Sequence, residues 1–265
     1  MTIQEQVRKP EPLPVFEEDA STKSRPTPVT SVLLSETSHA AEQFRLLASR
    51  VGALGRGRQL RTIGVVSASA GEGKTTVAIG LARSLALGGR TRVLLAEADL
   101  RRPALDATLG LPPPSIGVLR YLERGESSLR IRKVDTAEGC WLLSAGAGAL
   151  RRPDILASPR MTALLEAATR SFAYVVLDCP PLIQVSDAVL LQDQIDGFVF
   201  VVRSRHAPRE AVHRALSLLK PGAVLGVVFN GHQEIVKSYY NYGYDDDYYA
   251  PRGNEPKRLR SRRPV

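Results

Sequence analysis

The sequence predicts an α/β fold, a mostly parallel sheet flanked by helices on both faces, with disordered N- and C-terminal tails. Short runs that are apolar throughout alternate with longer amphipathic segments, a pattern typical of buried parallel strands joined by helices. A glycine-containing loop joins one such run to the helix after it. Acidic residues, Asp99 and Asp178, follow or end two other runs, at the strand ends where ligands of parallel sheets bind.

The helices and strands are expected in a clear order. An apolar stripe over 38–51 indicates a first helix, and the apolar run 62–68 indicates a first strand. The segment 75–87 has helical periodicity and stops before Gly88 and Gly89, as helices commonly do. Further strands are expected at 92–96, 140–143, 173–177, 198–202 and 224–229, and further helices at 115–124, 160–170, 186–191 and 209–219.

Composition divides the 265 residues into three parts. Residues 1–37 are rich in Pro, Glu, Ser and Thr over most of their length, which predicts a disordered N-terminal segment. Residues 38–235 hold the expected helices and strands and form the predicted folded domain. Residues 236–265 begin with clustered tyrosines and end in a basic run, and we expect them to form a flexible tail.

Charge and cysteine content indicate a cytoplasmic protein. Cys140 and Cys179 both lie in apolar runs, so buried, reduced thiols are expected. No run approaches the roughly 20 apolar residues that span a bilayer, and the N-terminus lacks the apolar core of a signal peptide. The net charge of +9 is concentrated in the last residues, where a basic run is compatible with nucleic acid or anionic lipid. A solvated, disordered end is the preferred interpretation, and no nucleic-acid partner is expected.

The loop after the first strand predicts phosphate binding. Small residues let backbone N–H groups curl around an anion, and the following helix adds partial positive charge. Lys74 is expected to reach the β- and γ-phosphates and the Thr75 hydroxyl to bind Mg²⁺. The alternative is an ordinary glycine turn before a helix. The expected nucleotide-binding residues are Ala70, Gly71, Glu72, Gly73, Lys74, Thr75 and Thr76.

Three acidic residues are candidates for metal binding and proton transfer. Asp178 ends a buried strand and suits a Mg²⁺ ligand; the alternative is a turn or helix-capping aspartate. Glu97 and Asp99, two positions apart at a strand end, share a face, so one can contact metal while the other accepts a proton from an attacking hydroxyl. Alternatively, one of them pairs with Arg101 or Arg102.

Two further features bear on ligands. Asn230 follows the last expected strand, and its carboxamide offers the donor and acceptor that suit an adenine edge; the alternative is a turn asparagine. The tail carries six of the eight tyrosines of the chain within eleven residues, and such a segment could stack bases, aggregate or be a substrate. These tyrosines are Tyr239, Tyr240, Tyr242, Tyr244, Tyr248 and Tyr249.

Taken together, these motifs resemble those of the bacterial tyrosine kinases, which are P-loop proteins related to the MinD and ParA ATPases. The resemblance covers roughly residues 38–250 and rests on the phosphate loop, on Glu97-Ala98-Asp99-Leu100-Arg101-Arg102-Pro103, on Asp178-Cys179-Pro180-Pro181 and on the tyrosine cluster. It implies ATP and Mg²⁺ as cofactors, with catalysis by Lys74, Glu97, Asp99 and Asp178 and metal binding by Thr75, Asp99 and Asp178.

The resemblance also implies a function and partners. Such kinases phosphorylate their own C-terminal tyrosines, usually between subunits of a ring, and regulate capsular or extracellular polysaccharide synthesis and export. The implied partners are a separate transmembrane activator of the polysaccharide co-polymerase type, which would hold the kinase at the inner membrane, a cognate tyrosine phosphatase, and further copies of the chain.

Three departures from the family pattern leave alternatives open. Glu97 replaces the usual first aspartate, Ala70 replaces a proline, and the second arginine of the helix used in ring assembly is missing, although Arg50 lies nearby. A catalytically degenerate nucleotide-binding scaffold is therefore one alternative. Another is a ParA- or MinD-like ATPase switch, but that group typically carries a lysine at the position of Ser69.

Overall fold

The computed structural model describes residues 11–19, 25, 27–34, 38–55, 57, 59–87, 89, 91–134, 138–148 and 152–231. The six tail tyrosines and the basic C-terminal run lie outside the described residues. The fold is therefore the fold of the chain up to Gly231.

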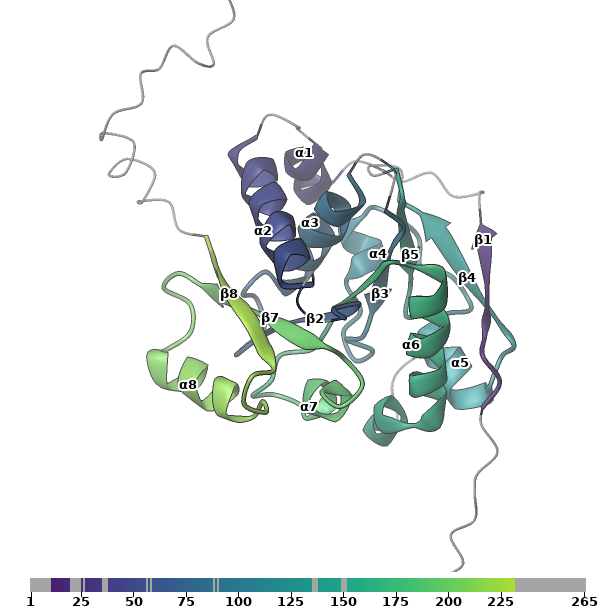
Figure 1. The fold of residues 1–265 in the computed structure, drawn as a ribbon. Coiled ribbons are helices and arrows are strands. Elements are labelled where there is room, and N and C mark those ends of the chain that lie inside the picture. The colour runs from purple at the N-terminus through teal and green to yellow at the C-terminus, as the bar shows by residue number, and fades with distance from the viewer. Residues whose placement is uncertain are drawn as a thin grey trace, which may run out of the picture. The chain divides into compact units, whose positions relative to one another are not determined.

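One eight-stranded sheet runs through the molecule (Figure 1). Its strand order is β1-β4-β5-β3-β6-β2-β7-β8. All neighbouring pairs are parallel except β4 and β5, which pair antiparallel. The strands are β1 Val15–Asp19, β2 Thr62–Ser67, β3 Val93–Glu97, β4 Ser128–Lys133, β5 Cys140–Leu143, β6 Tyr174–Asp178, β7 Gly197–Arg203 and β8 Val224–Asn230.

Helices cover both faces of this sheet. Apolar residues of α1 to α4 pack against one face, and those of α5 to α8 pack against the other (Figure 1). This arrangement confirms the predicted fold class. The helices are α1 Pro28–Leu34, α2 His39–Gly55, α3 Lys74–Ala86, α4 Leu105–Thr108, α5 Val118–Arg124, α6 Pro159–Ser171, α7 Asp187–Leu191 and α8 Arg209–Ser217, with a 3₁₀ helix, η1, at Pro153–Ala157.

The central strands are apolar throughout because both of their faces are covered. Ile63 and Val65 of β2 pack into one hydrophobic cluster, and Val66 of the same strand packs into the other. In β7, Phe200 and Val201 divide between the clusters in the same way. Successive side chains of a strand point to opposite faces, so a strand buried on both sides loses the polar alternation of an exposed sheet.

The expected disorder of residues 1–37 is wrong for two stretches, the strand β1 and the helix α1. In β1, Val15 donates a backbone hydrogen bond to Ser127 (N···O 3.0 Å), and the Phe16 ring meets the Phe172 ring edge-on, with centroids 5.7 Å apart. Next to α1, the hydroxyl of Thr27 donates to the carbonyl of Thr108 (2.7 Å). Strand β1 is mostly acidic and helix α1 is only seven residues long, and both depend on partners distant in the sequence, which local composition does not reveal.

Strand β4 was also missed, because its sequence carries three basic residues. One of them, Arg132, is 4% exposed and forms an ion pair with Asp106 of α4. It also donates to the hydroxyl of Ser144 (2.7 Å) and to the carbonyl of Pro112 (2.7 Å). A buried arginine is tolerated here because its donors are paired.

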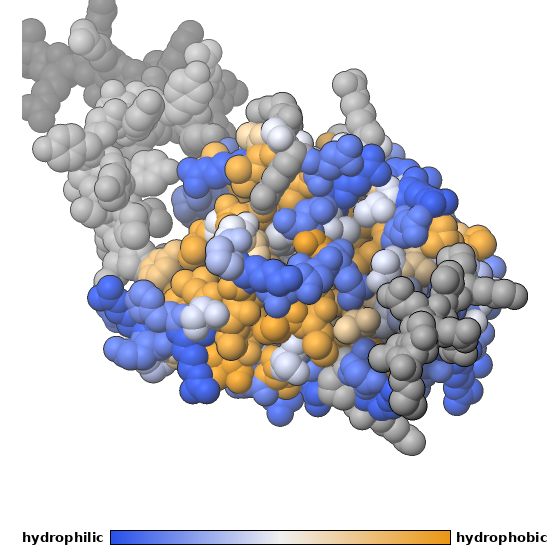
Figure 2. All heavy atoms as spheres, turned by 60° about the horizontal axis from the view of Figure 1, so that its bottom comes forward, coloured by the Kyte–Doolittle hydropathy of each residue, from blue (hydrophilic) through white to orange (hydrophobic). Residues whose placement is uncertain are grey.

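Helix α2 confirms the expected first helix and extends it to Gly55. It packs closely on α3, because a Cβ atom added at Gly80 would lie only 2.5 Å from the ring of Phe44. Within the residues that the structure describes, no helix is long and apolar enough to cross a membrane. Apolar side chains nevertheless reach the surface on one side of the molecule, between hydrophilic ones (Figure 2), and Val227 and Phe229 of the edge strand β8 are both more than half exposed.

Candidate nucleotide site

The predicted site residues meet at the carboxyl end of the sheet. The phosphate loop follows β2, Asp178 ends the neighbouring strand β6, and Glu97 ends β3 on the other side of β6. Glu97 and Asp178 are paired in register across these two strands. The parallel topology therefore brings together acidic residues that are 81 positions apart in the sequence.

The phosphate loop has the conformation that its glycines allow. Gly71 and Gly73 have φ values of +83° and +93°, in the left-handed region that suits glycine. Helix α3 begins directly afterwards at Lys74, so the helix N-terminus faces the loop. Inside the loop, the Ser69 hydroxyl donates to the Glu72 carboxylate (2.8 Å). Lys74 itself is only 8% exposed.

Asp178 has the surroundings of a cation ligand. It is 2% exposed, its Oδ1 atom has no hydrogen-bond partner among the described residues, and Thr75 hydrogen-bonds to its carboxylate. Burial raises the pKa of Asp178 to about 7, although the hydrogen bond from Thr75 and the charge of Lys74 oppose this shift. An ionised carboxylate there lacks water and a full set of donors, which a bound cation would compensate.

These oxygen donors suit Mg²⁺. The set predicted from the sequence is the Thr75 hydroxyl with the carboxylates of Asp99 and Asp178. Asp178 ends β6, and Thr75 and Asp99 follow the ends of the adjacent strands β2 and β3. The described residues contain no group of three or more His, Cys, Asp or Glu residues arranged to hold a metal on their own. Mg²⁺ usually takes one or two carboxylates together with substrate phosphates, so a closed protein cage is not required.

Glu97 is held differently from the other acids. One carboxylate oxygen accepts hydrogen bonds from the backbone N–H groups of Ala104 (2.8 Å) and Leu105 (3.0 Å), and the other accepts from that of Asp99 (3.2 Å). It does not pair with Arg101 or Arg102, the alternative left open by the sequence. Burial and the neighbouring Asp178 raise its pKa well above the usual range. The hydrogen bonds of Glu97 therefore hold the loop that carries Asp99, and we expect Asp99 rather than Glu97 to accept a proton.

We expect phosphate transfer to depend more on Asp99 than on Glu97. Asp99 is only partly buried and one of its oxygens accepts from the backbone N–H of Arg102 (3.0 Å), whereas both oxygens of the buried Glu97 are engaged. Asp99→Asn should therefore lower the rate roughly 100-fold at saturating Mg-ATP, and Glu97→Gln roughly tenfold or less. Single-turnover phosphate transfer measures both rates, with Glu97→Asp as the matched control. The opposite ranking would assign the proton acceptor to Glu97.

An ion pair that the sequence did not indicate borders the site. The guanidinium of Arg101 donates to both carboxylate oxygens of Asp187 (2.7 and 3.2 Å), and Asp187 is fully buried at the start of α7. The pKa of Arg101 is raised by this bond. The pair ties the loop after β3, which carries Asp99, to the segment that follows Asp178 at the end of β6.

Three side chains from β7, β8 and the turn after β7 lie on the outer side of the phosphate loop. Arg203 donates to the carbonyl of Gly71 (3.0 Å), and the Nε2 atom of His206 lies 2.8 Å from the carbonyl oxygen of Ala70. Asn230 donates from Nδ2 to the carbonyl of Glu72 (2.9 Å). The sequence pointed to Asn230 for adenine and gave His206 no role; the adenine contact remains a prediction.

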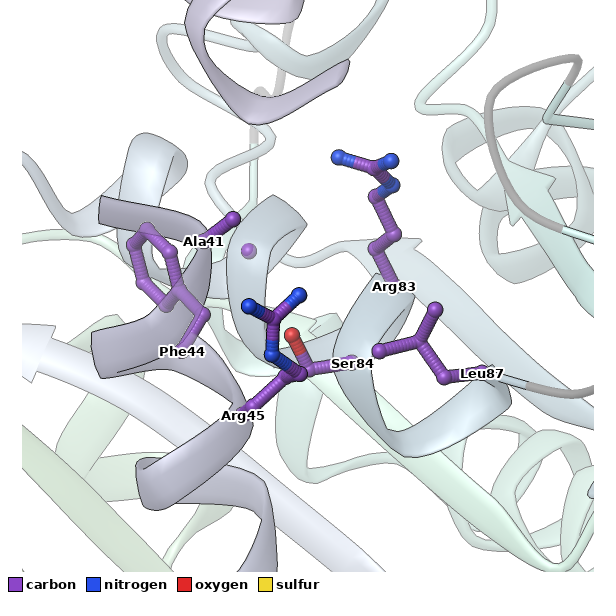
Figure 3. A pocket seen from close by; sticks show the side chains of 7 residues that line it. Ala41, Phe44, Arg45, Arg83, Ser84 and Leu87 are labelled. Carbon is purple, nitrogen blue, oxygen red and sulfur yellow. The ribbon is translucent and has the colours of Figure 1, made fainter. Parts of the chain in front are cut away.

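Two surface cavities lie away from this site. One, of about 160 Å³, lies between α2 and α3 and is bordered by Phe44, Arg45 and Arg83 (Figure 3). The other, of about 540 Å³, is open and contains Asp193 and Asp196, near the amino end of β2. Neither is bordered by a residue of the phosphate loop.

Known proteins are similar to this chain in sequence and fold. The family model of the CobQ/CobB/MinD/ParA nucleotide binding domain matches residues 63–233. The chain is 29% identical over 206 residues to the tyrosine-protein kinase YwqD of Bacillus subtilis, covering 77% of this chain and 85% of YwqD. It is 36% identical over 196 residues to the succinoglycan biosynthesis transport protein ExoP of Rhizobium meliloti, covering 72% of this chain but 25% of ExoP.

A solved structure agrees with these similarities. The BceF tyrosine kinase domain superposes with a TM-score of 0.64 at 26% identity, covering 75% of this chain and 80% of that domain. The resemblance predicted from the phosphate loop, the acidic strand ends and the tyrosine cluster is thereby confirmed.

Proposed function

The chain belongs to the CobQ/CobB/MinD/ParA nucleotide-binding family, and from this premise we propose that it is an ATP-dependent kinase that phosphorylates its own C-terminal tyrosines. One observation carries the proposal: Lys74, Thr75 and Asp178 meet at one sheet edge, beside Asp99, in a chain with six tyrosines in its tail. The similarity to tyrosine kinases supports the choice of tyrosine as the acceptor.

The residues divide the work of phosphoryl transfer. Loop N–H groups and Lys74 hold the β- and γ-phosphates of ATP, and Thr75 and Asp178 would hold Mg²⁺, which neutralises phosphate charge when bound. Asp99, which the sequence also offers as a metal ligand, is assigned to proton transfer, because a carboxylate bound to a cation is a weak base. The tyrosine oxygen forms the new bond to the γ-phosphorus while the bond to the ADP oxygen breaks. Asp99 takes the tyrosine proton, and Glu97 keeps the Asp99 loop in place.

An alternative function within the same family, an ATPase switch of the MinD or ParA kind, is less well supported. That group typically places a lysine at position 69, whereas Ser69 here hydrogen-bonds to Glu72 within its own loop. We further propose regulation of capsular or extracellular polysaccharide synthesis, because ExoP is named as a succinoglycan biosynthesis transport protein. A transmembrane activator, a phosphatase and self-assembly belong to this proposal.

Phosphate should appear on tail tyrosines when the purified protein is incubated with Mg-ATP. Alignment with the γ-phosphate compensates for the poor nucleophilicity of a neutral tyrosine hydroxyl. Mass spectrometry should find phosphate within 239–249, and a variant with all six tail tyrosines changed to Phe should lose this labelling while binding ATP normally. Labelling that persists in the Phe variant, or is confined to Tyr121 or Tyr174, would contradict the assignment.

The phosphorylated tail should also leave the site. Each phosphate adds about −1.5 to −2 charges beside Asp245, Asp246 and Asp247, which repels the product from a site that holds ATP and carboxylates. Analytical ultracentrifugation with the activator's cytoplasmic segment should show an assembly that ATP disperses in the wild type and not in the Phe variant. Equal dispersal of both proteins would contradict this mechanism.

A further inference from the structure

The carbonyl groups of the phosphate loop are contacted by side chains from other parts of the sheet. Three successive carbonyls, those of Ala70, Gly71 and Glu72, each receive one side chain at 2.8–3.0 Å. The three side chains are His206, Arg203 and Asn230. None of them is close in sequence to the loop, so the contact joins the ends of β7 and β8 to the loop after β2.

Holding these carbonyls outward has a consequence for the inner side of the loop. In a trans peptide the C=O of one residue and the N–H of the next point in opposite directions. With the carbonyls of Ala70, Gly71 and Glu72 turned outward, the N–H groups of Gly71, Glu72 and Gly73 are turned to the other side. Three successive N–H groups turned to one side can form a concave anion site.

The two loop glycines are also where the covering side chains come closest. A Cβ atom added at Gly73 would lie 2.1 Å from Nδ2 of Asn230, and one added at Gly71 would lie 3.3 Å from the His206 ring. The glycines therefore serve two purposes. They adopt positive φ values, and they leave room for side chains from another part of the sheet.

The backbone of the turn after β7 is strained where it presents these side chains. Arg205 has a φ of +56°, the only positive φ of a non-glycine residue in the described part of the chain. This conformation costs a non-glycine residue about 1 kcal/mol or more and is held by the surrounding structure. Arg205 separates Arg203 from His206, and both of these reach the loop.

We propose that Arg203, His206 and Asn230 form a clamp that fixes the phosphate loop from its carbonyl side and so presets its N–H groups for the phosphates of ATP. The clamp residues are positioning residues, because they contact the loop and act on the nucleotide through it. This inference rests on the proposed nucleotide site and adds the part of the molecule that shapes it. Because the loop would hold the β-phosphate, the clamp should affect ATP and ADP alike.

The test is nucleotide affinity in variants that remove or keep each donor. His206→Leu and Arg203→Met should each raise the Kd for Mg-ATP and Mg-ADP about five- to tenfold, as expected for one lost hydrogen bond, and the double variant should raise it further. His206→Gln, which keeps a donor, should restore most of the affinity. KM for ATP should rise with kcat nearly unchanged, since the loop binds substrate and transition state alike.

Arg209→Met provides the matched control. Arg209 lies on the first turn of α8, and its side chain contacts His213. Its substitution by methionine removes the same charge as Arg203→Met. The clamp is overturned if the wild type binds Mg-ATP and the double variant binds it equally well, or if Arg209→Met weakens binding as much. It is also overturned if the melting temperature without nucleotide falls in proportion to the affinity. A wild type that binds no Mg-ATP would overturn both the clamp and the proposed function.

Discussion

Lys74→Met is expected to abolish Mg-ATP binding and all phosphate transfer. Lys74 is 8% exposed at the first position of α3, and its ammonium group is the one side-chain cation that the loop motif directs at the β- and γ-phosphates. Without it the phosphates face the carboxylates of Asp99 and Asp178 with less positive charge. We expect the Kd to rise about 100-fold or more, as for a buried charged pair that loses one partner.

Calorimetry on the folded variant measures this effect. Methionine keeps the length and the apolar stem of the side chain, so the variant should retain the wild-type circular dichroism spectrum. Lys220→Met is the control, since Lys220 pairs with Asp193 at the surface. Undiminished affinity in Lys74→Met would refute the phosphate-loop assignment, and an equal loss in Lys220→Met would attribute the effect to net charge.

The features predicted best from the sequence are those set by local pattern. The strand at β5 was predicted with its observed bounds, and the helices α3 and α6 were predicted to within one residue at each end. Each is marked by an unbroken apolar run or by helical periodicity with an adjacent stop signal. The convergence of the loop with Asp99 and Asp178 was predicted too, because parallel strands end at one edge.

The features that were missed depend on pairing across the chain. Strand β1 is held by β4, and β4 tolerates Arg132 because Asp106 and Ser144 receive its donors. The clamp was missed because it too joins segments that are distant in the sequence. His206 has no metal-ligand spacing and no motif around it, so its place beside the loop follows only from the parallel neighbours β2 and β7. The hydrogen bonds of Glu97 likewise became visible only with the loop after β3 in place.

Asp178→Asn is expected to change activity and stability in opposite directions. Burial raises the pKa of Asp178 from an ordinary value of about 3.9 to about 7 in the folded chain. Below about pH 4 the carboxyl is protonated in both states and the shift contributes nothing. Between the two pKa values only the unfolded chain ionises, so the free energy of unfolding falls as the pH rises. Above about pH 7 the full free-energy penalty of burying this carboxylate is present.

Asparagine removes the penalty and with it the metal ligand. Without nucleotide, the variant should therefore melt about 4 °C or more above the wild type at pH 8, and this advantage should shrink as the pH falls toward 5. Its phosphate transfer should nevertheless fall roughly 100-fold and respond far less to added Mg²⁺, because a neutral amide cannot offset the charge of the cation.

Differential scanning fluorimetry from pH 5 to 8, beside transfer rates over a Mg²⁺ titration, tests both expectations on the same preparations. Asp187→Asn is the control, because Asp187 is a buried carboxylate with a structural role. Asp187 is fully buried in a bidentate pair with Arg101, so its amide variant should melt below the wild type. A destabilised Asp178→Asn that keeps full activity at low Mg²⁺ would show that Asp178 is a structural turn residue. If Asp178 binds a cation at a cost in stability, Asp178→Asn should be more stable than the wild type and inactive.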